Sequence, residues 1–393
     1  MTFVRVGDVA QQVRGVTYAK PDASAQCLSG TVALLRANNV NDDGLNFDEL
    51  LFVKDTCVSE KQMLRPGDIV VAASSGSLSV VGKAAQLTTP FDGTFGAFCK
   101  VVRPSARVHA RYLGHFFRTK DYRTTISALA AGANINNLKN EHINDLMIRL
   151  PSLDQQRRIS AILDHADAIR TNHKRSVALL RQLRRAFFRT TFADLAKYPE
   201  YSFSDLVASQ RIGLVRAAGE FGDGLPFPYV RMDAISRDGE ILFDLIKTTD
   251  ASGKEAVTYS LQAGDFLFNT RNSRELVGKA AVWNGPDGCL FNNNIMRVRF
   301  GALVLPDYVQ QVLLTPGLRH ELETRKTGTT SVFAVYWRDL QTLPVPVPPI
   351  SLQASFSTKL HEVERLRAAY EDQLTVAEAL FASLQHRAFN GEL

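Results

Sequence analysis

The chain has 393 residues, more than one hydrophobic core usually holds, so we expect at least two domains. Its hydrophobic content of 45% and charged content of 22% are those of an ordinary globular protein, and no apolar run reaches the length of a membrane span. The net charge of +6 and pI near 9.1 permit a polyanionic partner, and the N-terminus lacks a signal peptide, so we expect a cytoplasmic protein with no membrane partner.

Residues 1–150 are predicted to form a mixed globular domain. Short β-favouring runs bounded by turn residues predict strands at TVALLRA (31–37), DIVVAA (68–73), VGKAAQL (81–87) and AFCKVV (97–102). We interpret Gly67 and Gly82 as tight turns beside buried strands, where glycine adopts a conformation that side chains forbid. A helical stretch is expected around residues 110–129.

The stretch LRPGDIVVAASSGSLSVVGKAA (64–85) looks like a phosphate-binding loop, but its spacing argues against one. A Walker A loop has two glycines at a fixed spacing, followed by Lys and then by Ser or Thr. Here Gly76 and Gly82 are one position too far apart, and Ala84 follows Lys83. We therefore do not expect nucleotide binding.

Long helices are predicted for residues 151–198 and 348–393. In each, residues recur at spacings of three and four, the pattern of a helix packed along a partner helix. The positions are Ile162, Ala166, Ile169, His173, Ser176, Leu180, Leu183 and Phe187, and then Phe356, Leu360, Val363, Leu366, Tyr370, Leu374, Ala377, Leu380 and Leu384. Each helix would be a rod of roughly 50 Å, so an antiparallel pair would hold the globular parts at a fixed distance.

Residues 199–347 are predicted to form a second globular domain of the same kind. Its β-favouring runs are PYVRM (228–232), DFLFNT (265–270), GKAAVW (278–283) and NIMRVRF (294–300), and a helical stretch is expected around residues 307–325. Gly264 and Gly278 are interpreted as turns, like the glycines of the first domain.

The second half of the chain repeats the first at a shift of 197 positions. This shift relates Asp8 to Asp205, Gly67 to Gly264, and Gln156 to Gln353. Chance does not keep one register along a whole chain, so we infer two copies of one unit. The loops SSGSLS (74–79) and RNSREL (271–276) differ strongly on this shared scaffold, and such loops are where distinct ligands would be read.

The two helices differ in charge. Residues 156–192 carry nine Arg or Lys against two Asp, whereas residues 353–389 carry four basic against five acidic residues. The positive charge of the first helix is either a solvated face or a basic stripe for a partner subunit or DNA.

The motifs that carry catalysis are absent from the sequence. It lacks the glycine-rich cofactor loop and the Asn/Asp-Pro-Pro-Tyr/Phe motif of amino-methyltransferases, and it has no HExxH. Its cysteines form no CxxC pair that would predict a zinc ribbon or a disulfide framework; they are Cys27, Cys57, Cys99 and Cys289. We expect no catalytic residues, no metal site and no cofactor bound by this chain.

Three segments resemble the specificity subunit of Type I restriction–modification systems. They are Leu-Pro-x-Leu-x-x-Gln-x-x-Ile at 150–159, Val-Pro-Pro-Ile-x-x-Gln-x-x-Phe at 347–356, and the ending Leu384-Gln385-x-x-Ala388-Phe389-x-Gly391-Glu392-Leu393. The resemblance covers essentially the whole chain, and it is strongest in the helices and weakest in the loops.

The resemblance implies an α+β fold with two similar α/β target recognition domains, separated by two long antiparallel coiled-coil helices in a pseudo-two-fold internal repeat. In such proteins each globular domain reads one half of a split double-stranded DNA sequence. Two methyltransferase subunits dock on the helices, and a translocating endonuclease subunit joins them. S-adenosylmethionine, ATP and Mg²⁺ are expected on those partners only. If the centres of the two half-sites lie about one DNA turn apart, neither domain reads the roughly six base pairs between the half-sites.

Polar and basic loop residues are the candidates for DNA contact, because Lys and Arg bind phosphates, and Arg, Asn and Gln read base edges. In the first domain they are Ser74, Ser75, Ser77, Lys83, Asn134, Asn136, Asn137 and Lys139. In the second domain they are Arg271, Asn272, Arg274, Lys279, Arg325, Lys326, Thr327, Thr329 and Thr330.

Two other functions remain open from the sequence. One is a scaffold or adaptor protein with two domains for a non-DNA ligand on a coiled-coil ruler. The other is a fused single-chain restriction enzyme whose catalytic half has been lost or lies elsewhere. The salt dependence of duplex binding separates the scaffold from a DNA reader, because phosphate neutralisation imposes a steep slope.

Overall fold

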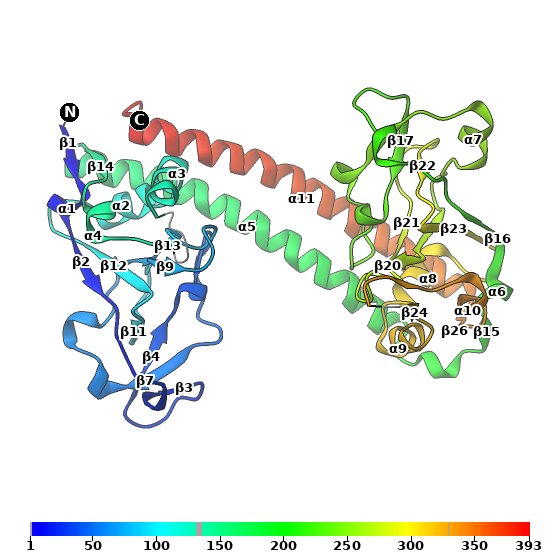
Figure 1. Cartoon of the computed structure of the whole chain (residues 1–393), viewed down its shortest axis with the longest axis horizontal. Coiled ribbons are helices and arrows are strands. Elements are labelled where there is room, and N and C mark those ends of the chain that lie inside the picture. The colour runs from blue at the N-terminus through cyan, green and yellow to red at the C-terminus, as the bar shows by residue number, and fades with distance from the viewer. Residues whose placement is uncertain (1, 131–135, 329) are drawn as a thin grey trace. The chain divides into compact units, whose positions relative to one another are not determined.

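The computed structural model describes residues 2–130, 136–328 and 330–393. The chain forms two compact units, Met1–Arg175 with Tyr370–Leu393, and Ser176–Ala369. Each unit combines β-sheets and short helices with part of each of the two long helices, α5 (Leu153–Thr191) and α11 (Ile350–Asn390) (Figure 1). The boundary between the two units therefore falls inside each long helix and not at its ends.

The first unit contains two four-stranded sheets. The antiparallel sheet β10-β8-β12-β2 consists of β2 (Ala10–Arg14), β8 (Ile69–Ala72), β10 (Ala84–Gln86) and β12 (Cys99–Pro104). The sheet β11-β4-β7-β3 consists of β3 (Ala23–Ser24), β4 (Thr31–Leu35), β7 (Leu51–Lys54) and β11 (Gly93–Phe95). Three strand pairs complete it: β1 (Thr2–Arg5) with β14 (Met147–Leu150), β5 (Val40–Asn41) with β6 (Gly44–Leu45), and β9 (Ser74–Ser75) with β13 (Asn136–Asn137).

Short α-helices cover one face of the antiparallel sheet of the first unit. The α-helices are α1 (Val6–Val9), α2 (Ala110–Phe116), α3 (Lys120–Ala130) and α4 (Asn140–Asn144). The 3-10 helices are η1 (Lys20–Asp22), η2 (Ala37–Asn39), η3 (Asp55–Cys57) and η4 (Glu60–Gln62). Helix α2 is joined to α5 by the ion pair of Arg111 with Asp164, and residues from α2, α3 and α5 share one core with the sheet.

The second unit repeats this plan. Its sheet β16-β23-β19-β21 consists of β16 (Val207–Ile212), β19 (Phe266–Asn269), β21 (Ala280–Val282) and β23 (Ile295–Phe300). Its other strands are β15 (Glu200–Ser202), β17 (Phe227–Val230), β18 (Lys247–Thr249), β20 (Arg271–Asn272), β22 (Leu290–Phe291), β24 (Thr327–Gly328), β25 (Phe333–Ala334) and β26 (Pro344–Pro346).

The second unit has helices at positions that correspond to those of the first, with α6, α8, α9 and α10 in the places of α1, α2, α3 and α4, and it also contains α7. The α-helices are α6 (Phe203–Leu206), α7 (Gly253–Thr258), α8 (Pro306–Val312), α9 (Pro316–Thr324) and α10 (Trp337–Leu340). The 3-10 helices are η5 (Leu195–Lys197), η6 (Ala218–Glu220), η7 (Met232–Ala234) and η8 (Phe243–Leu245). Each helical stretch expected from the sequence, around 110–129 and 307–325, is two helices joined by a short turn.

In each main sheet one inner strand, β8 or β19, is a run of buried apolar residues, and β19 ends in the buried Asn269. In β8, Ile69 and Val71 belong to the core formed with α2, α3 and α5, whereas Val70 belongs to a second core on the opposite face. In β19, Phe266 contributes to the helix-side core and Leu267 to the other one. Successive side chains of a strand point to opposite faces, so a strand between two cores requires an unbroken apolar run.

A glycine and a buried aspartate precede this strand in both units. Gly67 and Gly264 have φ values of +97° and +90°, which confirms that they are turns requiring glycine. The carboxylate of Asp68 accepts hydrogen bonds of 2.8 Å from Nε and Nη2 of Arg103, and it is 1% exposed. Asp265 is paired with Arg299 in the same way. The repeated Gly-Asp therefore forms a turn that is held to a neighbouring strand by an ion pair.

A buried glutamine fastens each long helix to the start of a short helix in the same unit. The Oε1 atom of Gln156 accepts a hydrogen bond of 2.8 Å from the backbone N–H of His109, which caps α2, and its Nε2 donates to the carbonyl of Pro151. Gln353 repeats both contacts, with Leu305 at the start of α8 and with Pro348. Both glutamines are at most 1% exposed. The glutamine of each Pro-containing motif is therefore a structural joint.

Within each unit the two long helices run antiparallel. In the first unit the rings of His173 and Tyr370 are 5.8 Å apart, and the Arg170 guanidinium lies 5.1 Å from the centre of the Phe381 ring. In the second unit Arg184 pairs with Glu364 at 3.5 Å, and the ring of Phe356 lies 5.4 Å from that of Phe192. These contacts confirm the predicted antiparallel pairing in each unit.

The helix seam differs in part from the predicted one. Four predicted seam residues are 37–49% exposed, namely Ile169, Leu183, Leu366 and Leu380. Arginines occupy seam positions instead: Arg184 is 6% exposed, and the side chains of Arg170 and Arg367 are 14% and 17% exposed. The apolar stem of arginine packs like a hydrophobic residue while its guanidinium reaches an acidic partner. A pattern that counts only apolar residues cannot detect such positions.

We predict that Gly82→Ala destabilises the first unit, whereas Gly76→Ala does not. Gly82 has a φ of +80°, and a Cβ there would lie 2.3 Å from Cγ2 of Ile126. The strained backbone and the overpacking together should cost about 2–4 kcal/mol. The space around Gly76 is open. Urea denaturation followed by circular dichroism measures both; equal midpoints for the two variants would contradict the prediction.

Candidate nucleic-acid interface

The loops SSGSLS and RNSREL are anchored by the same pattern of backbone hydrogen bonds in the two units, which we call the backbone frame. In the first unit the N–H of Ala73 donates to the carbonyl of Phe98, and the N–H of Leu138 donates to the carbonyl of Ala73, both at 2.8 Å. The second unit repeats the frame with Thr270 N to Asn294 O at 2.8 Å and Val335 N to Thr270 O at 2.9 Å. One scaffold therefore presents two loops of unlike sequence.

In the first unit this frame brings together candidates that lie far apart in the sequence. Strand β9 pairs antiparallel with β13, so Ser75 lies opposite Asn136 and Ser74 lies opposite Asn137. Asn137, Lys139 and Ser77 are exposed; the hydroxyl of Ser77 is 2.8 Å from that of Ser79. Asn134 lies outside the described residues, as does the side chain of Asn136.

In the second unit the corresponding pairing joins three segments in the order β20-β25-β24. Arg271 lies opposite Ala334 and Asn272 lies opposite Phe333, while Thr327 pairs with Ala334 from the other side. Thr330 is exposed and follows β24 closely, whereas Thr329 lies outside the described residues. The structure thus joins one end of each predicted segment, Arg271 and Asn272 of the first and Thr327 of the second, on one small sheet.

Most of the predicted basic residues are already engaged within their own unit. The list is Lys83 with Asp42 at 2.8 Å, Arg274 with Glu323 at 2.8 Å, Arg325 with Glu321 at 2.6 Å, and Lys326 with Glu323 at 2.7 Å. The ammonium of Lys279 donates to the carbonyls of Met232 and Ile235, and burial lowers its pKa. Arg271 is exposed and has no ion-pair partner among the described residues, so it is the basic candidate of this loop most available to a ligand.

A cavity of about 810 Å³ opens beside Arg271 in the second unit. The polar side chains that line it include Gln210, Asn293, Asn294, Tyr336 and Arg338. Arg, Asn and Gln are the side chains that read base edges, and aromatic rings stack on bases. The sequence prediction missed these five residues, although Asn292-Asn293-Asn294 and Tyr336-Trp337-Arg338 are polar and aromatic runs that could have indicated them.

The first unit presents a different side chain at one of these positions. Asn294 of the second unit corresponds to Phe98, whose carbonyl occupies the same place in the backbone frame. Phe98 is 69% exposed, and Leu78 in the neighbouring loop is 47% exposed. The two units therefore offer chemically unlike surfaces on equivalent scaffolds: amides and arginine in one, and hydroxyls with exposed apolar groups in the other.

Within residues 2–130, 136–328 and 330–393, no three His, Cys, Asp or Glu side chains are grouped as metal ligands. None of the helices in this part of the chain is both long and apolar enough to cross a membrane.

The fold and the loops together define a doubled recognition protein, in which one scaffold occurs twice with unlike binding surfaces. Residues 1–181 match the family described as the Type I restriction modification DNA specificity domain. The chain is 30% identical to the Type I restriction enzyme EcoKI specificity subunit of Escherichia coli, covering 99% of this chain and 88% of that protein. It is 28% identical to the StySPI specificity subunit of Salmonella potsdam over the same shares. This chain belongs to the family of Type I restriction enzyme specificity subunits.

Solved structures show the same fold. The Type I restriction–modification S subunit from M. genitalium superimposes with a TM-score of 0.62 at 13% identity, over 99% of this chain and 96% of that one. A chain from a structural study of complex assembly in the Type I system matches with a TM-score of 0.52 at 16% identity, over 100% and 98% of the two chains. At these identities the likeness concerns the fold alone.

We predict that Lys279→Met lowers the stability of the second unit by about 1–3 kcal/mol, because two carbonyls lose a charged donor. The exposed Lys254→Met is the matched control and should leave stability within about 0.5 kcal/mol. Both tryptophans of the chain, Trp283 and Trp337, lie in this unit, so tryptophan fluorescence during urea denaturation reports its unfolding. A Lys279→Met protein as stable as the control would show that the amine is not structural.

Proposed function

We propose that this chain is the DNA-reading subunit of a Type I restriction–modification complex and that each unit reads one half of a bipartite target. The observation that carries the proposal is the repeated backbone frame, which presents unlike loops at equivalent positions. A protein that must read two different half-sequences needs one scaffold with two divergent reading surfaces. Family membership over 99% of the chain supports the same function.

In this proposal the two units contribute different contacts. The second unit reads its half-site with Arg271 and Asn272 and with the amides that line the neighbouring cavity. The first unit uses Ser74, Ser75, Asn137 and Lys139, with Phe98 available for the methyl group of thymine. The engaged residues Lys83, Lys279, Arg325 and Lys326 support the loops instead of contacting DNA.

The proposal assigns the chemistry to partner subunits. We infer that two methyltransferase subunits dock on the long helices, that a translocating endonuclease subunit joins them, and that S-adenosylmethionine, ATP and Mg²⁺ are bound by those partners. This chain would be non-catalytic and cytoplasmic. The absence from its sequence of the amino-methyltransferase motifs and of HExxH supports this division of labour. The scaffold and the fused-enzyme alternatives are less favoured, because the full-length relatives are specificity subunits.

We predict that Arg271→Ala weakens binding at the second half-site by about 1–3 kcal/mol and relaxes the preference at one base pair. Arg325→Ala is the matched control, because that guanidinium is held by Glu321 at 2.6 Å. Footprinting of the assembled complex on its target measures both half-sites separately. An unchanged footprint at the second half-site in the Arg271→Ala complex would refute this assignment.

Selection from random duplex DNA should return an asymmetric target in two parts, separated by about six unread base pairs. The affinity of the complex for this target should fall steeply with salt. The logarithm of the binding constant should fall with the logarithm of the salt concentration, with a slope of about −0.9 for each phosphate contact. Methylome sequencing of cells that carry this chain with its methyltransferase gives an independent readout. A single continuous palindrome would contradict the two-reader proposal, and a salt-independent affinity would favour the scaffold.

A further inference from the structure

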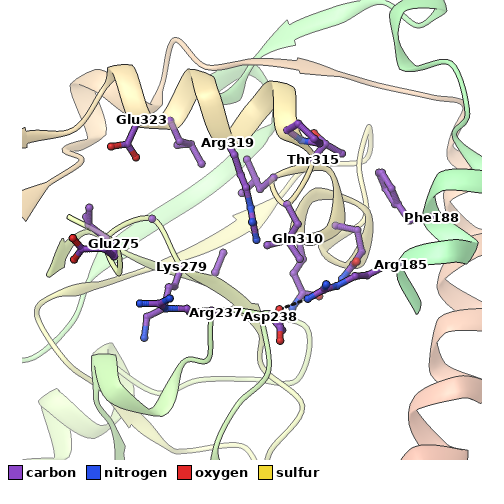
Figure 2. A pocket seen from close by; sticks show the side chains of 18 of the residues that line it. Arg185, Phe188, Arg237, Asp238, Glu275, Lys279, Gln310, Thr315, Arg319 and Glu323 are labelled. Atoms are coloured by element: carbon purple, nitrogen blue, oxygen red, sulfur yellow. Dashed lines mark hydrogen bonds and ion pairs between the residues drawn. The ribbon is translucent and has the colours of Figure 1, made fainter. Parts of the chain in front are cut away.

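A second cavity of the second unit, of about 830 Å³, lies apart from the proposed reading surface. Its walls come from α5, α8, α9, β21 and the segment that follows β20. Arg319 points from α9 into the cavity, and Arg237 and Asp238 lie opposite (Figure 2). Arg271 and Asn272 do not line this cavity. The start of the loop from 271 to 278 therefore carries the proposed reading residues, and the end of the loop lines this cavity.

The cavity carries an excess of positive charge that the unit does not neutralise. Among its basic lining residues, Arg185 pairs with Asp238, and Lys326 pairs with Glu323. Arg189, Arg237 and Arg319 also line it, are exposed, and have no ion-pair partner among the described residues. Glu275 also lines the cavity as an acidic neighbour of Arg237. The three guanidinium groups outnumber it, which favours an anionic ligand.

A buried donor points to the same kind of ligand. Gln311 lines the cavity and is 3% exposed, yet its Nε2 has no hydrogen-bond partner among the described residues. A buried amide N–H without an acceptor costs about 1–3 kcal/mol, so such a group is expected to meet an acceptor when the protein is at work. The remaining wall is apolar and includes Phe188, Val277 and Leu313.

In the first unit, the residues that correspond to Gln311 and Arg319 make hydrogen bonds within the unit. At a shift of 196 positions, Gln311 corresponds to His115, whose Nε2 lies 2.8 Å from Oδ1 of Asp164, while its Nδ1 has no hydrogen-bond partner among the described residues. Arg319 corresponds to Arg123, whose guanidinium donates to the carbonyls of Val81 and Ser79. The second unit therefore leaves open, at equivalent positions of the same scaffold, two donors that the first unit closes.

We propose that this cavity docks an acidic segment of a protein partner, with a carboxylate held by Arg237, Arg319 and Gln311 and a neighbouring apolar side chain against Phe188 and Leu313. The apolar wall and the depth of Gln311 favour a flexible peptide carboxylate over the phosphates of a duplex, which stand on the outside of a stiff rod. The inference rests on the proposed function, because the partner is sought among the methyltransferase subunits of that complex.

The test is the affinity between the full chain and its co-purified methyltransferase subunits, measured by fluorescence anisotropy at low salt. Arg319→Glu and Arg237→Glu should each weaken assembly by about tenfold or more through charge repulsion, while Lys254→Glu, an equal charge change on an exposed residue away from the cavity, should not. DNA footprints of complexes formed at saturating subunit concentration should be unchanged. Arg319→Gln, which removes the charge without reversing it, replaces Arg319→Glu if that variant does not fold.

The outcomes separate this inference from the proposed function. Variants that assemble as tightly as Lys254→Glu would overturn the docking site and leave the DNA-reading proposal intact. Variants that assemble normally but lose DNA affinity would show that the cavity binds phosphate, which also overturns the inference. A wild-type chain that binds no methyltransferase subunit would overturn the proposed function and this inference with it.

Discussion

The buried amide of one glutamine per unit is the contact on which the architecture depends. Gln156 and Gln353 each tie the first turn of a long helix to the start of a short helix that packs on the main sheet. Because the amide is withdrawn from water, each of its hydrogen bonds must be made within the protein, and the geometry of the joint is closely determined. The sheet, the short helices and the long helix of a unit are thereby held as one body.

The loops beside the main sheet present unlike side chains in the two units. The backbone bonds that anchor the loops are repeated in both units at nearly the same lengths, whereas the side chains that the loops present are unlike. A loop on a rigid scaffold can change its side chains without disturbing the core, so recognition can diverge while the fold is retained. The proposed asymmetry of the DNA target and the open cavity of the second unit both follow from this separation of scaffold and surface.

Charge is used differently at the surface and in the interior. Several basic residues that look available in the sequence are neutralised by acidic neighbours or by carbonyl groups, as Lys83 and Lys279 are. Others, such as Arg184, are buried between the helices and paired with a single carboxylate. Net charge alone therefore says little about where an anionic ligand binds, because it does not separate the neutralised residues from those without an ion-pair partner among the described residues, such as Arg271 and Arg319.

The sequence by itself determined the doubled architecture, the apolar strands, the glycine turns and the long paired helices. These features depend on local periodicity and on a residue spacing that is still recognisable in both copies. It also indicated the two loop clusters of each domain. Only the tertiary structure decided that Ser75 meets Asn136 and that Arg271 meets the segment after α9, that arginines occupy the helix seam, and that Gln210, Asn293 and Tyr336 share a cavity. These features join residues far apart in the chain, and whether a charged side chain is free or engaged depends on a neighbour that no local pattern specifies.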